Sequence, residues 1–166
     1  AVAGRRMLDG AARLLAVSTA ERHQFHELGV CDSRVRVVPN PIDFDEFAPA
    51  VTRGRFRQAY GLGDRPVVLY LGTLTPRKRV PDLARAIDRL KRPDVALVVA
   101  GNDMGDGAAV RRIVQALGLT PRTTFTGLLT GRARLEALAD ADVVVYPGDH
   151  EIFGLVPIEA LLCGTP

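Results

Sequence analysis

The chain has 166 residues, of which 47% are hydrophobic and 25% are charged, with a formal net charge of +3. These values are ordinary for a globular protein, and the length allows one substantial core with a small appendage. The basic residues are scattered rather than grouped in Lys/Arg blocks, which argues against a dedicated nucleic-acid surface.

The first predicted elements are a short apolar run, a helix and a strand. Ser18 follows the apolar run 13–17 and is a good helix N-cap, and Glu21, three residues later, completes a capping box. We therefore predict a helix from Thr19 to Leu28, stopped by a glycine, and then a strand over 35–38.

Pro39-Asn40-Pro41 comes next and cannot continue a regular element. We interpret residues 1–40 as the end of one domain with a linker, and residues 41–166 as a second, incomplete domain. A helix is predicted around 53–60.

From residue 66 onwards, apolar strands alternate with amphipathic helices. The predicted strands lie at 67–71, 95–100, 123–126 and 143–146, and the predicted helices at 81–90, 108–117 and 132–139. Near-continuous Val/Leu strands of this kind indicate a parallel sheet covered on both faces. We expect an α/β fold, a Rossmann-like doubly wound sheet, truncated at both ends. In such sheets ligands bind at the carboxyl ends of the strands.

The loop after the first of these strands is basic. Gly72 lets the backbone approach a ligand, and Arg77 and Lys78 supply positive charge at the strand end. Cations fixed there would stabilise a leaving group that gains negative charge, such as a nucleoside diphosphate. A solvated basic turn is the alternative interpretation.

Two glutamates eight positions apart, Glu151 and Glu159, follow the last predicted strand. A helix is expected to open around 154–157, because proline is tolerated in a first helical turn. The N–H groups of Phe153, Gly154 and Leu155 would then face an anion, and the two carboxylates would accept hydrogen bonds from sugar hydroxyls. An acidic loop followed by an ordinary helix is the alternative.

Three segments together resemble a known family. Glu151-x-Phe153-Gly154-Leu155-x-Pro157-x-Glu159 is similar to the Glu-x7-Glu signature of retaining GT-B glycosyltransferases, family 4. Residues 37–43, followed by Phe47, resemble that family's interdomain linker, and residues 68–78 resemble its first donor-domain strand and phosphate loop. The resemblance covers nearly the whole chain but only about half of a complete enzyme.

The resemblance implies a GT-B C-terminal domain that binds a nucleotide sugar (a UDP-, GDP- or ADP-sugar) and transfers the sugar with retention of configuration. It implies no cofactor and no metal. The acceptor (a lipid, a glycan or a small molecule) would be bound by the absent N-terminal domain. Peripheral membrane association would also come through that half, and the isolated fragment is expected to be inactive.

The resemblance also assigns roles to individual residues. Lys78 matches the phosphate-binding lysine, Glu151 would contact the transferred sugar, and Glu159 would accept from the ribose; Lys78 and Glu151 are the catalytic candidates. Thr73 and Arg79 depart from the family pattern, so either Arg77 or Arg79 could deliver the second positive charge. The full set of donor-binding candidates is Gly72, Thr73, Arg77, Lys78, Gly127, Leu128, His150, Glu151, Phe153, Gly154, Leu155 and Glu159.

Other interpretations stay open. A GT-B epimerase or phosphorylase would share the scaffold, although no pyridoxal-binding lysine region is found. A non-catalytic nucleotide- or sugar-binding module is the second alternative. Asp140-Ala141-Asp142 matches the metal-diphosphate motif of a different glycosyltransferase fold, but its place between a helix and a strand favours capping.

The cellular setting follows from three absences in the sequence. No apolar run is long enough to cross a bilayer, and the first residues lack a signal-peptide core. Cys31 and Cys163 form no CxxC pair, so two reduced cysteines are expected. We therefore expect a cytoplasmic protein. The chain lacks an initiator Met and stops directly after a helix, so we expect a piece of a longer polypeptide.

Overall fold

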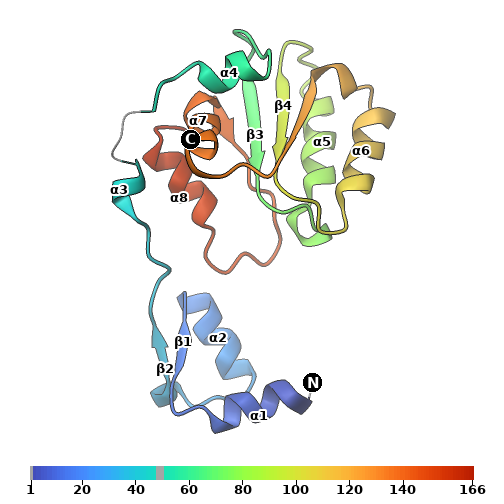
Figure 1. The fold of residues 1–166 in the computed structure, drawn as a ribbon. Coiled ribbons are helices and arrows are strands. Elements are labelled where there is room, and N and C mark those ends of the chain that lie inside the picture. Colours follow the sequence, from blue (N-terminus) through green and yellow to red (C-terminus); the bar gives the residue numbers. More distant parts are fainter. Residues whose placement is uncertain (1, 48–50) are drawn as a thin grey trace. The chain divides into compact units, whose positions relative to one another are not determined.

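The computed structural model describes residues 2–47 and 51–166, with the side chains of residues 2 and 3 left out of the description. By its internal contacts the chain divides into two compact units (Figure 1). The smaller unit contains residues 1–42 and 151–155, and the larger unit contains residues 43–150 and 156–166.

The smaller unit has two short parallel strands with helices around them. Its elements are α1 (Val2–Gly10), β1 (Leu14–Ala16), α2 (Thr19–Glu27), the 3-10 helix η1 (Asp32–Arg34) and β2 (Val35–Val37). Ser18 caps α2 by accepting the Glu21 N–H at 3.2 Å, and the Glu21 carboxylate accepts the Val17 N–H at 2.6 Å. The predicted N-cap at Ser18 is confirmed, whereas Glu21 reaches the N–H of Val17, one residue before the cap, and not that of Ser18 as in a full capping box. The helix α1 was not predicted.

The larger unit is built on a four-stranded parallel sheet in the order β5-β4-β3-β6. Its elements are α3 (Phe44–Phe47), α4 (Arg55–Ala59), β3 (Val67–Leu71), the 3-10 helix η2 (Pro76–Lys78), α5 (Val80–Arg89), β4 (Ala96–Ala100), α6 (Gly107–Ala116), the 3-10 helix η3 (Thr120–Arg122), β5 (Thr123–Gly127), α7 (Gly131–Asp140), β6 (Val143–Val144) and α8 (Leu155–Leu162). The predicted alternation of strands and helices from residue 66 onwards is confirmed.

Alternation along β3 divides the core between the two faces of the sheet. Val67, Leu69 and Leu71 pack on one face with residues of α4, α7 and α8. Val68 and Tyr70 pack on the other face with residues of α5 and α6. Figure 1 shows these helices on opposite sides of the sheet. All five residues of β3 are buried, as expected for a parallel strand covered on both faces.

The last strand is shorter than predicted. β6 was expected to extend to Tyr146 but ends at Val144. The Val145 N–H still donates to Leu69 O at 2.9 Å, and Pro147, two residues later, has no N–H to continue the ladder.

Two further findings concern the described residues. No helix among them is both long enough and apolar enough to span a membrane. Cys31 and Cys163 are not joined in a disulfide.

Candidate functional site

The basic turn, residues 72–79, follows the carboxyl end of β3. After Gly72 the chain forms η2 and enters α5 through Arg79, whose φ of 52° lies in the left-handed region. The side chains of Arg77 and Arg79 are exposed, and that of Lys78 is partly buried. Three cationic residues therefore lie at the strand end where parallel sheets bind ligands.

The loop after β4 holds this turn in place. The Gly72 N–H donates to Ala100 O, and the Leu74 N–H donates to Asn102 O, both at 2.9 Å. The two loops are so close that a Cβ at Gly101 would lie 1.8 Å from the Gly72 carbonyl oxygen. A side chain at position 101 is therefore incompatible with this packing, a constraint that sequence reasoning missed.

A buried tyrosine supports the turn from inside the unit. Tyr70 is fully buried, and its hydroxyl donates to Thr73 O at 2.8 Å. Thr73 therefore contributes its backbone carbonyl to the anchoring of the turn.

The loop after β6 holds the candidate lysine. Lys78 Nζ donates to the Tyr146 hydroxyl and lies 4.5 Å from the centroid of the Tyr146 ring, within the range of a cation–π contact. Tyr146 was predicted only as the end of a strand, and its place beside Lys78 was missed because the two lie 68 positions apart in the sequence.

A second link joins the same two loops. The Asp149 N–H donates to Arg77 O at 2.9 Å, and the Asp149 carboxylate pairs with Arg79 at 2.7 Å. Arg79 also pairs with Asp82 at 2.7 Å, and hydrogen bonds to Asp82 and Asp149 raise the pKa of Arg79. Arg77 forms no ion pair with any residue that the structure describes, which leaves its charge available to a ligand.

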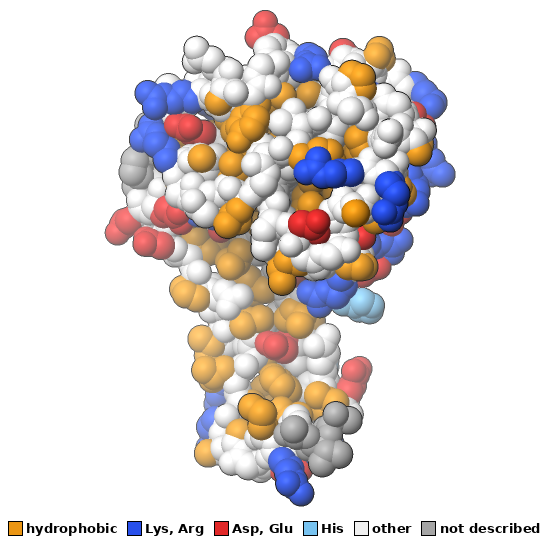
Figure 2. Space-filling model, turned by 45° about the vertical axis from the view of Figure 1, so that its right-hand side comes forward, with side chains coloured by type: hydrophobic (Ala, Val, Ile, Leu, Met, Phe, Trp, Pro, Cys, Tyr) orange, Lys and Arg blue, Asp and Glu red, His pale blue; other side chains and the backbone are white. Residues whose placement is uncertain are grey.

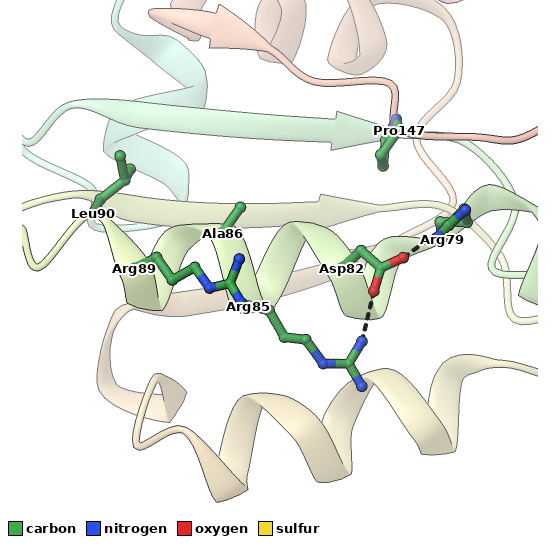
Figure 3. A pocket seen from close by; sticks show the side chains of 7 residues that line it. All are labelled: Arg79, Asp82, Arg85, Ala86, Arg89, Leu90 and Pro147. Atoms are coloured by element: carbon green, nitrogen blue, oxygen red, sulfur yellow. Dashed lines mark hydrogen bonds and ion pairs between the residues drawn. The ribbon is translucent and has the colours of Figure 1, made fainter.

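A pocket of about 590 Å³ lies beside α5, starting at the Arg79 end of the basic turn (Figure 3). Its lining residues are Arg79, Asp82, Arg85, Ala86, Arg89, Leu90 and Pro147. Figure 3 shows Asp82 bonded to both Arg79 and Arg85, and the hydrogen bond from Arg79 is the main cause of a lowered Asp82 pKa. This carboxylate offsets part of the positive charge of the pocket.

The helices α5 and α6 also carry exposed arginines on their outer surface. These are Arg85 and Arg89 on α5 and Arg111 and Arg112 on α6. Figure 2 shows basic side chains gathered along the right-hand side of the larger unit. The mild excess of positive charge in the sequence is thus partly concentrated on one side of this unit.

Glu159, on α8, is held by an arginine of α7. Its Oε1 pairs with Arg134 at 2.6 Å, and the two side chains are only 15% and 18% exposed. Arg134 also pairs with Glu46 of α3 at 2.6 Å and lies 6.0 Å from the centroid of the Phe47 ring. Burial lowers the pKa of Arg134, but hydrogen bonds to the two glutamates outweigh it, so the guanidinium stays charged. Sequence reasoning named Glu159 but not Arg134.

The segment from Glu151 to Leu155 belongs by its contacts to the smaller unit. α8 begins at Leu155, inside the predicted window, and Gly154 precedes it with a φ of 73°. The helix start is confirmed. Phe153 and Gly154 both precede the helix. Of the three N–H groups that were predicted to face an anion, only that of Leu155 therefore belongs to α8. A contact between Glu151 and the bound sugar stays a prediction.

The remaining donor candidates lie in the larger unit. Gly127 has a φ of 73° and accepts the Gly101 N–H at 2.7 Å, and Leu128 beside it is 65% exposed. His150 is exposed in a left-handed conformation with a φ of 53°. The loops after β3, β4 and β5 are therefore joined by hydrogen bonds along one edge of the sheet.

The Asp-x-Asp motif has a structural role. The Asp140 carboxylate is 5% exposed and accepts the N–H groups of Gly54, Phe56 and Arg57 at 2.6, 2.9 and 3.1 Å, so it caps α4. Asp142 pairs with Arg57 at 2.8 Å. Capping was the predicted role. Within 2–47 and 51–166, no three His, Cys, Asp or Glu side chains form a group that could hold a metal ion.

Comparison with known proteins identifies the family. The model of the glycosyl transferases group 1 matches residues 52–166. The chain belongs to this family. The D-inositol 3-phosphate glycosyltransferase of Mycolicibacterium smegmatis is 34% identical over 172 residues, covering 100% of this chain and 39% of that protein. The corresponding protein of Mycobacterium tuberculosis is 34% identical over 171 residues, covering 99% of this chain and 35% of its own length.

Solved structures agree with the family assignment. Anabaena HepE, crystallised with UDP and glucose, superposes with a TM-score of 0.89 at 26% identity, covering 99% of this chain and 46% of that one. Sucrose-phosphate synthase from Thermosynechococcus elongatus gives a TM-score of 0.79 at 31% identity, with 99% and 42% covered. The predicted GT-B fold is confirmed. The chain spans about two fifths of the length of these relatives.

Proposed function

We propose that the chain carries the donor-binding half of a retaining, metal-independent glycosyltransferase of family 4, which transfers a sugar from a nucleotide sugar to an acceptor. The observation that carries the proposal is Lys78, held against Tyr146 in a basic turn that is anchored to the loops after β4 and β6. Fixed cations at a strand end suit the diphosphate of a nucleotide sugar and the charge that it gains on leaving.

The main candidate residues have separate roles in this proposal. Lys78 and Arg77 bind the diphosphate, together with the amides at the start of α8. Glu159 accepts from the ribose hydroxyls, and Glu151 contacts the transferred sugar. The backbone around Gly127 contacts the base. No side chain is nominated as a nucleophile.

The donor and acceptor classes rest on relatives. Because HepE was crystallised with UDP and with UDP-glucose, UDP-sugars are the first donors to test, before GDP- and ADP-sugars. Because the mycobacterial relatives are D-inositol 3-phosphate glycosyltransferases, a phosphorylated polyol is one acceptor to test, beside lipids and glycans. Acceptor binding, cytoplasmic placement and peripheral membrane attachment belong to the whole protein and are part of the proposal.

Calorimetry of the full-length protein with UDP, GDP and ADP, with EDTA present, tests the donor site. One of the three should bind. Glu159→Ala should weaken that binding by about 10- to 100-fold, the size expected for hydrogen bonds to a charged group. Lys78→Ala should mainly slow transfer, because its charge acts on the leaving group.

Lys91→Ala is the matched control, since Lys91 is exposed just after α5 and, among the described residues, forms an ion pair only with Asp88, at 3.1 Å. It should change neither binding nor turnover. Binding of none of the three nucleotides, or full activity of Lys78→Ala, would refute the donor-site proposal.

A further inference from the structure

We propose that Arg134 is a positioning residue that orients the Glu159 carboxylate toward the ribose of a bound nucleotide. The inference rests on the proposed function, in which Glu159 binds the ribose. It adds a residue from a different helix, outside the Glu-x7-Glu segment, and a physical reason for the orientation of Glu159.

The orientation of the Glu159 carboxylate depends on which of its two oxygens is held by the protein. Oε1 lies 2.6 Å from the Arg134 guanidinium, and no described residue other than Arg134 pairs with the Glu159 carboxylate. A carboxylate fixed at one oxygen has a defined plane, so the second oxygen has a defined direction. A ribose hydroxyl that donates to Oε2 therefore meets an acceptor already in place, which reduces the entropy lost on binding.

Arg134 is itself held in place by its neighbours. It pairs with Glu46 at 2.6 Å on α3, and its guanidinium lies 6.0 Å from the Phe47 ring centroid. With its side chain only 18% exposed, the guanidinium has little room to move. Its fork of donors can serve two carboxylates at once, which a lysine ammonium does with less directional control.

Arg134 also keeps the Glu159 carboxylate ionised. Glu159 is 15% exposed, and a carboxylate buried to that extent without a partner would be costly to keep ionised. Arg134 supplies the partner, so Glu159 remains an acceptor toward hydroxyl groups. Glu46 balances the arginine from the other side, so the cluster Glu46–Arg134–Glu159 is a three-membered ionic network.

A purely structural role, in which Arg134 only joins α7 to α8, makes a different prediction. A structural loss would weaken every ligand of the site to a similar extent. A positioning role acts only through the ribose hydroxyls, so a nucleotide that lacks them should be insensitive to the mutation. This contrast decides between the two roles.

The experiment is calorimetry on the full-length protein with two ligands. The first is the nucleoside diphosphate that the wild type binds, tried in the order UDP, GDP, ADP. The second is the 2′,3′-dideoxy analogue of that nucleotide. Arg134→Leu should raise the Kd of the first ligand about tenfold and leave the Kd of the analogue within twofold of wild type. Arg134→Lys should recover part of the loss.

The matched control is Arg132→Leu. Arg132 lies two positions before Arg134 on the same helix, α7, is exposed, and pairs with Glu136 at 3.0 Å. It should leave both Kd values unchanged. Melting temperatures of all variants show whether each is folded under the conditions of the titration.

Three results would overturn the inference alone: equal weakening of both ligands by Arg134→Leu, no weakening of either, or tighter binding of the first. Tighter binding would mean that Arg134 sequesters Glu159 from the ribose. If Glu159→Ala leaves the affinity for the first ligand unchanged, or the wild type binds no nucleotide, the proposed function fails, and this inference fails with it.

Discussion

Replacing Gly101 by alanine tests whether the basic turn depends on close packing between the loops after β3 and β4. The new Cβ would lie 1.8 Å from the Gly72 carbonyl oxygen, whereas real Cβ atoms essentially never come within 3.0 Å of another heavy atom. The obstacle is backbone, which cannot rotate away as a side chain can. The two loops must therefore separate.

The cost of that separation can be estimated from what it breaks. The Gly72 N–H bond to Ala100 O and the Gly101 N–H bond to Gly127 O flank the new methyl group. Each is worth about 1 kcal/mol net, and a non-glycine residue at the Gly101 φ of 150° adds about 1–3 kcal/mol of strain. Gly101→Ala should therefore lower the free energy of unfolding by about 3–5 kcal/mol, a large share of a typical domain stability.

Urea unfolding followed by circular dichroism measures this difference. Gly118→Ala is the control, since Gly118 also has a positive φ, 67°, but its added Cβ would meet nothing within 4 Å. The control should lose only about 1 kcal/mol. Equal stability of the two variants would show that the loops adapt at no cost, and the argument for a rigid turn would be wrong.

Three further predictions concern single side chains. Asp140→Ala removes the cap of α4 and should cost about 2–4 kcal/mol in urea unfolding; a loss below 1 kcal/mol would contradict the capping role. Tyr146→Phe keeps the ring under Lys78 but removes its hydroxyl, so it should weaken nucleotide binding a few-fold in calorimetry with an unchanged melting temperature; unchanged affinity would refute it. Hydrogen bonding from Arg22 lowers the pKa of Asp32 from 3.8 to about 2. Stability from this pair is therefore present above pH 4 and lost as the pH falls toward 2, and a carboxyl NMR titration giving a pKa near 3.8 would contradict this.

The elements that could be predicted are those with a strong local pattern. The valine-rich runs predicted the bounds of β3 and β4 to within one residue, and Ser18 with Glu21 predicted the start of α2. α3 was missed because four residues are too few for any periodicity to show. α1 was missed because Gly4 and Gly10 argue against a helix in its short span.

The site could be predicted only in part, for a related reason. Lys78 and Glu159 were identifiable because each belongs to a continuous motif. Their partners were not, because Tyr146 and Arg134 come from other elements and meet them only in the folded chain. A sequence pattern shows which residues carry charge, whereas burial and pairing decide which of those charges remain available.

That distinction separates the two arginines that flank Lys78. Arg79 is paired with Asp82 and Asp149, so its main effect is to tie the loop after β6 to the basic turn. Arg77 is bound through its carbonyl to the Asp149 N–H at 2.9 Å, while its guanidinium pairs with no other described residue. A cation stabilises a leaving group most when it is already fixed in place, because no reorganisation is then needed during the reaction. In the proposed reaction Arg79 therefore supplies rigidity and Arg77 supplies charge, so Arg79→Ala should act on Lys78 and Arg77 together by loosening both.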